Sequence, residues 1–242
     1  MTVLQLTSFQ EVFSRWNKHS AIPLSVSSID EILGGLLPCL HVVVGDSGVG
    51  KTWFCIKAIF HLLEQIPKAQ VLYNDFGGNF RITNLTKLLS SSYALDQITI
   101  FQPKSLLEQI IFFRNLLEKS KCFYNLIILD SVFGPPISCL EFFLKRGKFW
   151  EKHIFSHLLD LQVFAREFKI PILLTNHLMS ARMNLEMNPS LNQYGANLIE
   201  QFVPIEFLIQ KIEQNHILEV RVFQKKVGIS NFTLVPNRLS QF

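Results

Sequence analysis

An eight-residue glycine-rich segment constrains the fold of this chain more than any other feature. Residues 45–52 have the sequence G-D-S-G-V-G-K-T, which fits the pattern G-x-x-x-x-G-K-T. An apolar run at residues 40–44 comes directly before the segment, and a helical apolar pattern at residues 53–60 follows it. A strand, a glycine-rich loop and a helix in this order are typical of a phosphate-binding loop. The sequence therefore predicts a nucleoside triphosphate site here, and ATP is the expected nucleotide.

The residue types of this segment suit distinct parts of a triphosphate. Glycine lets backbone N–H groups turn inward around an anion, and the N-terminus of the following helix adds a partial positive charge. Lys51 is expected to contact the β- and γ-phosphates, and the Thr52 hydroxyl is expected to hold Mg²⁺. The predicted nucleotide-binding residues are Gly45, Asp46, Ser47, Gly48, Val49, Gly50, Lys51, Thr52 and Trp53.

Composition limits the class of protein. The 242 residues suffice for one α/β domain, and 48% hydrophobic with 17% charged residues indicates a globular chain. The net charge of +4 permits nucleic-acid binding without arguing for it. The four cysteines form no C-x-x-C pair, which favours reduced core residues over a disulfide framework or a zinc site. No signal peptide or bilayer-length apolar run is present, so the expected compartment is the cytoplasm, or the nucleus in a eukaryote.

Apolar runs and helical patterns alternate along the chain. Strands are expected at residues 40–44, 69–75, 97–101, 125–130, 170–176, 205–209, 217–223 and 232–235. Helices are expected at residues 9–17, 29–33, 53–60, 82–89, 104–117 and 150–168, with Ser27 and Ser28 capping the second. The alternation predicts an α/β fold, a mostly parallel sheet with helices on both faces, extended at one edge by antiparallel C-terminal strands. Residues 1–20 are expected to form an N-terminal helix or linker, and residues 21–242 the core domain.

Four candidate positions fall at the carboxyl ends of predicted parallel strands, where ligands of such sheets bind. They are Gly45, Asp75, Asp130 and Asn176. Asp130 closes the apolar run at residues 125–129, and a carboxylate there can hold Mg²⁺ opposite Thr52. The alternative role for Asp130 is capping the N-terminus of a helix. The predicted metal residues are therefore Thr52 and Asp130.

Several linked segments carry a resemblance to a known family. They are L-S-V-S-S-I-D-E-I-L-G-G at residues 24–35, V-L-Y-N-D-F-G-G-N-F-R at 71–81, L-I-I-L-D-S at 126–131, and F-A-R-E-F at 164–168 followed by I-L-L-T-N-H at 172–177. Their order and spacing resemble the RecA-type ATPase core of archaeal and eukaryotic strand-exchange recombinases, and most closely short paralogues such as archaeal RadB. The resemblance covers nearly the whole chain and implies a RecA-like P-loop NTPase fold with ATP and Mg²⁺ as cofactors.

Two positions depart from the family's pattern. The glutamate that orients the attacking water in the family aligns with Gly77, which has no side chain to do so. The glutamine that senses the γ-phosphate aligns with His177, and a histidine can also donate to phosphate. The resemblance thus implies catalytic roles for Lys51, Asp130 and His177, with tight ATP binding and weak hydrolysis. The alternative for His177 is a surface histidine without a role.

The resemblance also places two DNA-facing loops after the strands that end at Asp130 and Asn176. The first is expected at residues 132–148, with Lys145, Arg146 and Lys148, and the second at residues 178–194, with Arg182. Basic side chains on such loops suit a single-stranded phosphate backbone, although for Lys145, Arg146 and Lys148 the solvated start of a helix is the alternative. The family's self-assembly motif F-x-x-A is matched only by F-Q-E-V at residues 9–12. A complex with a recombinase or another paralogue is therefore the expected assembly.

These features lead to one main functional hypothesis and two alternatives. The main one is an ATP-binding recombinase paralogue that assists homologous recombination and DNA repair through single-stranded DNA, a recombinase partner, or both. The second is a RecA-fold regulatory ATPase of the clock-protein type, which acts through protein partners without DNA. The third is a metabolic phosphotransferase, for which the sequence offers no arginine-rich lid.

Overall fold

A computed structural model describes residues 21–86, 88, 92–119, 122–133, 136–177, 199, 201–212, 215–223 and 225–232. Several predictions lie outside these residues. They are the helix at residues 9–17, the second DNA-facing loop with Arg182, and residues 233–235 of the last predicted strand. The side chains of residues 136–151 and of His177 are also outside the described part of the chain.

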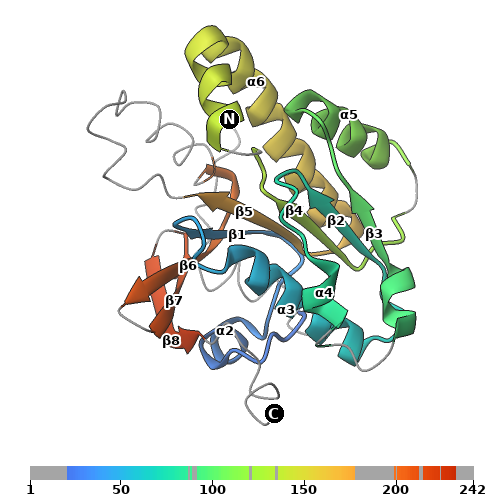
Figure 1. Cartoon of the computed structure of the whole chain (residues 1–242), viewed down its shortest axis with the longest axis vertical. Helices are drawn as coiled ribbons and strands as arrows, with labels where there is room; N and C mark the ends of the chain where they lie inside the picture. The colour runs from blue at the N-terminus through green and yellow to red at the C-terminus, as the bar shows by residue number, and fades with distance from the viewer. Residues whose placement is uncertain are drawn as a thin grey trace, which may run out of the picture.

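Strands and helices alternate in the structure as the sequence predicts (Figure 1). The helices are α2 (Ser27–Leu33), α3 (Lys51–Gln65), α4 (Ile82–Thr86), the 3-10 helix η2 (Ser92–Gln97), α5 (Leu106–Leu117) and α6 (Pro136–Phe168). The strands are β1 (Leu40–Gly45), β2 (Val71–Asp75), β3 (Ile98–Phe101), β4 (Leu126–Asp130), β5 (Ile172–His177), β6 (Ile205–Ile212), β7 (Asn215–Val222) and β8 (Lys225–Phe232).

The strands form one eight-stranded sheet in the order β3-β2-β4-β5-β1-β6-β7-β8. The first six strands in this order are parallel, whereas β7 and β8 pair antiparallel. This confirms the mostly parallel sheet with antiparallel C-terminal strands at one edge, and it shows that β6 itself runs parallel to β1. A long connection separates β5 from β6, which permits a parallel crossover, whereas only residues 213–214 separate β6 from β7 and force a hairpin.

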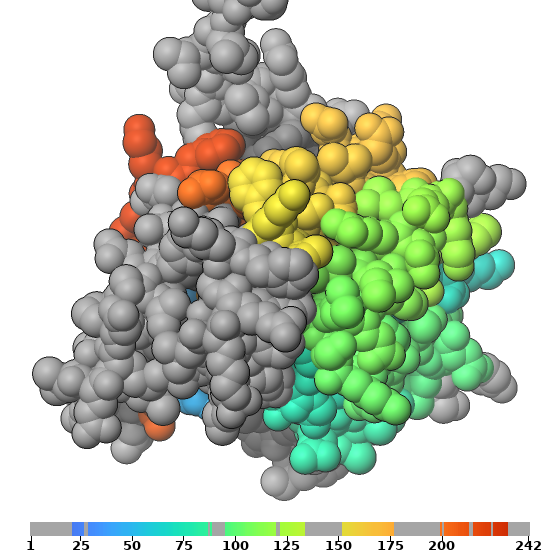
Figure 2. Space-filling view, turned by 90° about the horizontal axis from the view of Figure 1, so that it is seen from above, coloured from blue at the N-terminus to red at the C-terminus, as the bar shows by residue number. Residues whose placement is uncertain are grey.

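Helices cover both faces of the sheet (Figure 1). Along β1, Val43 belongs to the cluster beneath α2, α3 and α4, whereas Val42 and Val44 belong to the cluster beneath α5 and α6. Strands buried on both faces must be apolar at every position, which explains the continuous apolar runs in the sequence. Helices α5 and α6 lie side by side over their face, and Figure 2 shows them as adjoining green and yellow surfaces. Among the described residues, no helix combines the length and apolar character needed to cross a bilayer.

Helix α6 is the largest correction to the predicted elements. It has 33 residues and begins at Pro136, so the predicted loop at residues 132–148 is wrong and the helix predicted at 150–168 is too short. Proline suits the first turn of a helix because its missing N–H would have no partner there. The family resemblance places a loop here, and Gly147 does not prevent a helix, because glycine costs only about 1 kcal/mol in a helix interior. The long apolar face of a helix can offset that cost.

Smaller corrections concern element ends. Ser27 and Ser28 lie within α2 rather than before it, and the N-cap is Val26. The Asp30 carboxylate takes the capping role, accepting from the amides of Leu24 (2.8 Å) and Val26 (3.1 Å). Strand β8 begins at Lys225, seven residues earlier than predicted, because pairing with β7 imposes extended structure on a polar, glycine-containing segment.

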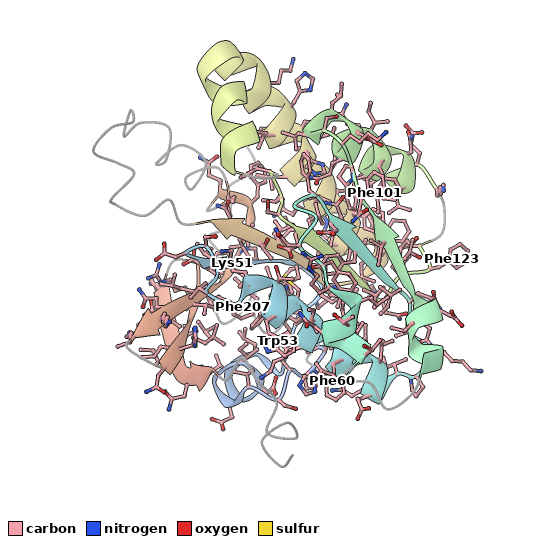
Figure 3. All side chains as sticks on the ribbon, in the orientation of Figure 1. Lys51, Trp53, Phe60, Phe101, Phe123 and Phe207 are labelled. Carbon is pink, nitrogen blue, oxygen red and sulfur yellow. The ribbon has the colours of Figure 1, made fainter. Side chains whose placement is uncertain are left out.

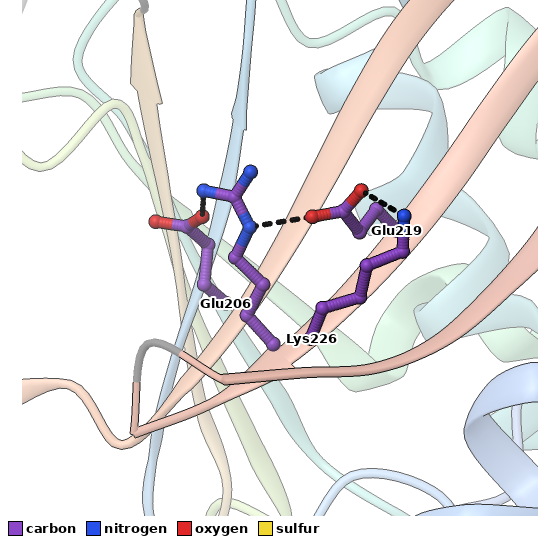
Figure 4. A network of polar contacts seen from close by, with 4 residues as sticks. Glu206, Glu219 and Lys226 are labelled. Atoms are coloured by element: carbon purple, nitrogen blue, oxygen red, sulfur yellow. Dashed lines mark hydrogen bonds and ion pairs between the residues drawn. The ribbon is translucent and has the colours of Figure 1, made fainter.

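An ion-pair network ties the last three strands together (Figure 4). Arg221 on β7 contacts Glu206 on β6 at 2.9 Å and Glu219 on its own strand at 2.7 Å. Lys226 on β8 contacts Glu219 at 3.1 Å. These side chains keep partial solvent exposure, so the network contributes modestly to stability and mainly fixes the pairing of neighbouring strands.

A buried polar network joins β2, α5 and α6 beneath the carboxyl ends of the strands. The Gln109 carboxamide accepts from Asn74 Nδ2 (2.7 Å) and donates to the Val132 carbonyl (2.8 Å) and to His157 Nε2 (3.2 Å). Burial, reinforced by the charge of Arg114, lowers the pKa of His157 to about 3, so the ring is neutral and Nε2 accepts. All three side chains are fully buried, and their mutual hydrogen bonds hold the segment after β4 against both helices.

Replacing Gln109 by leucine is expected to lower the free energy of unfolding by about 3 kcal/mol. Asn74 and Val132 would each lose a partner in a site that water does not reach, and each such group costs about 1–3 kcal/mol. Urea unfolding followed by circular dichroism measures the change. Gln162→Leu is the control, because Gln162 is exposed on α6. Equal unfolding midpoints for the two variants would contradict the stabilising role of the network.

Candidate nucleotide-binding site

The predicted phosphate loop lies between β1 and α3 at the carboxyl edge of the sheet. Gly48 and Gly50 have φ angles of 75° and 103°, a left-handed conformation that favours glycine. The first intrahelical bond of α3 joins the Phe54 amide to the Gly50 carbonyl at 2.9 Å. The preceding amides of the first turn therefore have no partner inside the helix and can face an anion. Local sequence thus produces the backbone geometry that a phosphate group requires.

Lys51 is the first residue of α3, and its side chain folds back over the loop (Figure 3). Its Nζ atom donates to the carbonyls of Gly45 (2.8 Å) and Asp46 (2.7 Å). The side chain is 5% exposed, so the ammonium group is desolvated. Burial lowers the pKa of Lys51 from 10.5 to about 8, although the charges of Asp130 and Asp46 partly offset this effect. A triphosphate in the loop would supply the anionic partners that the ammonium lacks.

Asp130 lies at the end of β4, and three hydroxyl groups donate to its carboxylate. Thr52 Oγ1 and the Tyr73 phenol donate to Oδ2, each at 2.7 Å. Thr175 Oγ1 donates to Oδ1 at 2.6 Å. The tertiary structure therefore brings together the two predicted metal residues, Thr52 and Asp130, which are far apart in sequence.

Thr52 and Asp130 fit a magnesium ion. Mg²⁺ prefers hard oxygen ligands and is held by one or two protein groups plus phosphates and water. The Thr52 hydroxyl uses its proton for Asp130, so its oxygen lone pairs remain available to a cation. Lys51 lies one residue before Thr52 and is positioned for the phosphates that such a cation would bridge. These residues can therefore hold a magnesium–triphosphate pair.

Asp75, at the end of β2, has a structural role beside this site. Its Oδ1 atom accepts from the amides of Asn79 (2.9 Å) and Phe80 (3.3 Å), and its Oδ2 atom accepts from Gln102 (3.0 Å). These bonds fix the turn that contains Gly77. The Gly77 amide donates to the Asp130 carbonyl at 3.3 Å, so Gly77 lies next to the end of β4.

A side chain at Gly77 requires the Asn79 carboxamide to move. A Cβ atom there would lie 2.5 Å from Asn79 Nδ2, the far end of a flexible side chain, and 4.0 Å from the Asp130 carbonyl oxygen. The φ angle of Gly77 lies outside the left-handed region. Glycine is therefore not required by the backbone at this position, and a longer side chain could reach toward the site.

The structure describes some of the remaining predicted residues fully, some only by their backbone, and one not at all. The backbone of His177 pairs with Gly45 at the end of β5, beside the phosphate loop. Trp53, on α3, is partly buried and packs against the hydrophobic core (Figure 3). Lys145, Arg146 and Lys148 lie on helix α6 rather than on a loop. Arg182 lies outside the described residues.

Sequence reasoning missed Tyr73 and Thr175 as partners of Asp130. Both residues belong to segments that resemble the recombinase core, and the sequence pattern assigned them to strands but to no site. Each side chain points toward Asp130 because parallel strands β2, β4 and β5 are neighbours in the sheet. A hydroxyl-bearing residue near the end of a predicted buried strand is the signal that the sequence offers.

The affinity for ATP is expected to fall as the pH rises through about 8. Only the charged ammonium form of Lys51 attracts phosphate, and burial places the pKa of Lys51 at about 8 in the free protein. Bound phosphate favours the charged form of Lys51, so above this pH Lys51 takes up a proton when ATP binds. The affinity for ATP therefore falls by at most about tenfold for each further pH unit. Calorimetric titrations at a series of pH values measure the slope. Lys51→Arg is the control, since arginine stays charged throughout. A wild-type affinity independent of pH would contradict the expectation.

Comparison with known proteins supports the fold of the chain. No protein-family model matches the sequence. A crystal structure of the RadB recombinase matches with a TM-score of 0.65 at 19% sequence identity. The match covers 88% of this chain and 96% of that chain, so the similarity in fold extends over most of both chains. The protein therefore has a RecA-like fold that resembles the RadB recombinase.

Proposed function

We propose that this protein is an ATP-binding recombinase paralogue that assists homologous recombination and DNA repair. The observation that carries the proposal is the convergence of Lys51, Thr52 and Asp130 at a phosphate loop on a RecA-like sheet. Lys51 binds the β- and γ-phosphates, while Thr52 and Asp130 hold Mg²⁺. His177, at the end of β5 beside Gly45, responds to the γ-phosphate. ATP and Mg²⁺ are the proposed cofactors.

Hydrolysis by this protein is proposed to be weak. The position next to the end of β4 that could hold a water-orienting carboxylate is Gly77, and the Asn79 carboxamide occupies the adjacent space. A carboxamide is not a general base at neutral pH. The bound nucleotide therefore acts mainly as a switch that sets the conformation of the protein.

Single-stranded DNA and a recombinase partner are the proposed targets of this switch. Helix α6 is the element after β4 in the chain and carries Lys145, Arg146 and Lys148, and Arg182 follows β5 in sequence. Basic residues can attract a phosphate backbone, with an affinity that falls as salt rises. The structurally similar RadB protein is named a recombinase, which agrees with single-stranded DNA and a recombinase as targets. The proposed assembly is a complex with a recombinase or with a further copy of this chain.

Binding of a labelled single-stranded oligonucleotide, followed by fluorescence anisotropy, tests the proposal. Wild-type protein is compared with Lys145→Glu/Arg146→Glu in the presence of a non-hydrolysable ATP analogue, ADP or no nucleotide, over a range of salt. The control is Lys68→Glu/Lys119→Glu, which reverses two exposed charges in the connections that lead into the amino-terminal ends of β2 and β4. Removing one basic side chain that binds a phosphate lowers the slope of log affinity against log salt by about 1.

The proposal predicts binding that depends on the ATP analogue and weakens with salt, with the slope lowered by about 2 only in the α6 variant. Binding unchanged in that variant would overturn the assignment of α6 to DNA. Nucleotide binding without any DNA binding would favour the regulatory ATPase that acts through protein partners. A pull-down against a purified recombinase would then establish whether a recombinase is that partner.

A further inference from the structure

Tyr73 connects the hydrophobic core to the Asp130 carboxylate. The tyrosine side chain is fully buried on β2, and its ring packs against Phe80 with the ring centroids 4.4 Å apart. Its hydroxyl group donates to Asp130 Oδ2 at 2.7 Å. Strand pairing places Tyr73 opposite Ile128 on β4, two residues before Asp130. The phenol is therefore fixed by packing at one end and by a carboxylate at the other.

The three hydroxyl donors occupy the two oxygens of Asp130 unequally. A carboxylate oxygen has two lone pairs for hydrogen bonds or a cation. Oδ2 accepts from both Thr52 and Tyr73, which uses both of its lone pairs. Among the described residues, Oδ1 accepts from Thr175. The Tyr73 hydroxyl therefore helps to fix the orientation of the carboxylate through the same oxygen that Thr52 contacts.

We propose that Tyr73 is a positioning residue for the metal-side carboxylate: its hydroxyl holds Asp130 Oδ2 and would keep the carboxylate in the orientation that the Mg²⁺ accompanying the nucleotide requires. The inference rests on the proposed nucleotide-binding function and deepens it. Partners that orient a ligating carboxylate affect metal affinity without touching the metal, and their loss weakens it by roughly 10- to 100-fold. Tyr73 would thereby set the magnesium dependence of nucleotide binding.

A substitution can remove the Tyr73 hydroxyl group and keep the packing of the ring. Phenylalanine has the same ring and can occupy the same space on β2, against Phe80 and the surrounding apolar cluster. Tyr73→Phe thus removes the hydrogen bond to Asp130 and little else. Tyr124→Phe is a matched control, because Tyr124 is half-buried just before β4, at the opposite end of that strand from Asp130.

The experiment measures binding of β,γ-imido-ATP by calorimetry, first in EDTA and then over a range of Mg²⁺ concentrations. For Tyr73→Phe, the Mg²⁺ concentration at half-maximal effect is expected to rise roughly 10- to 100-fold, while affinity in EDTA stays at the wild-type value. Tyr124→Phe is expected to match wild type in both conditions. Combining Tyr73→Phe with Asp130→Asn is expected to add no further loss beyond Asp130→Asn alone, because Tyr73 acts through Asp130.

Three results would overturn the inference. The Mg²⁺ dependence of Tyr73→Phe could equal that of wild type, its affinity could fall equally in EDTA, or its effect could add fully to that of Asp130→Asn. The second result would mean that the hydroxyl supports the fold of the site in general. A wild-type protein that binds no nucleotide would refute the proposed function itself, which separates that failure from a failure confined to Tyr73.

Discussion

Replacing Lys51 by methionine is expected to weaken binding of magnesium–ATP by about 100-fold. The ammonium group is buried and donates to the carbonyls of Gly45 and Asp46, from where it can turn to the phosphates. Losing its charge-assisted hydrogen bonds costs about 3 kcal/mol, and each 1.4 kcal/mol corresponds to a factor of about ten in affinity. Methionine retains most of the length and volume of the aliphatic chain, so the change isolates the charge.

Calorimetric titration of purified wild type and Lys51→Met with a non-hydrolysable ATP analogue provides the measurement. Lys57→Met is the matched control, because Lys57 lies on the same helix and is also partly buried. Circular dichroism would show that both variants keep the α/β fold. An affinity of Lys51→Met close to that of Lys57→Met would refute the phosphate-binding role of the loop.

Replacing Gly77 by glutamate is expected to raise the rate of ATP hydrolysis by about 100-fold. General bases contribute about 10²–10⁴ in rate, and Gly77 lies beside the end of β4, where its amide donates to the Asp130 carbonyl. The backbone accepts a side chain at this position, and only the Asn79 carboxamide must move. The expected gain follows from adding a carboxylate at the edge of a site that otherwise has the parts needed to bind ATP and Mg²⁺.

Steady-state phosphate release measures this gain. Glutamine at residue 77 has nearly the same shape as glutamate but no carboxylate. A rate increase in Gly77→Glu that is absent from Gly77→Gln would therefore identify general-base chemistry. A second variant, Gly77→Glu with Asn79→Ala, removes the side chain that crowds the new Cβ atom. If both glutamate variants bind ATP as the wild type does and hydrolyse it no faster than Gly77→Gln, a missing carboxylate at residue 77 does not limit hydrolysis.

The phosphate loop was predictable from sequence because its determinants are local. Glycines at positions 48 and 50, the preceding apolar run and the following helical pattern act within about twenty residues of one another. Their backbone conformations follow from residue type, since glycine permits the left-handed φ that the loop adopts. The alternation of buried strands and helices was likewise sufficient for the sheet and its two covered faces.

Element ends and pairing direction were less predictable. Helix α6 extends over residues that the family resemblance assigns to a loop, and Gly147 disfavours a helix there only weakly. The parallel orientation of β6 depends on which strand it joins after the long connection from β5. Strand β8 forms through hydrogen bonds to β7, although its own sequence contains glycine and several polar residues. Tertiary contacts outweigh such small local preferences.

The sequence by itself determined the phosphate loop, the strand-ending Asp130 and a mostly parallel α/β sheet, because each follows from residue type or periodicity over a short segment. Only the tertiary structure decided which side chains meet at Asp130. Tyr73 and Thr175 lie 57 and 45 residues from it along the chain, and they reach its carboxylate because β2 and β5 flank β4 in the sheet. Strand order depends on the packing of the whole sheet, which no local pattern specifies.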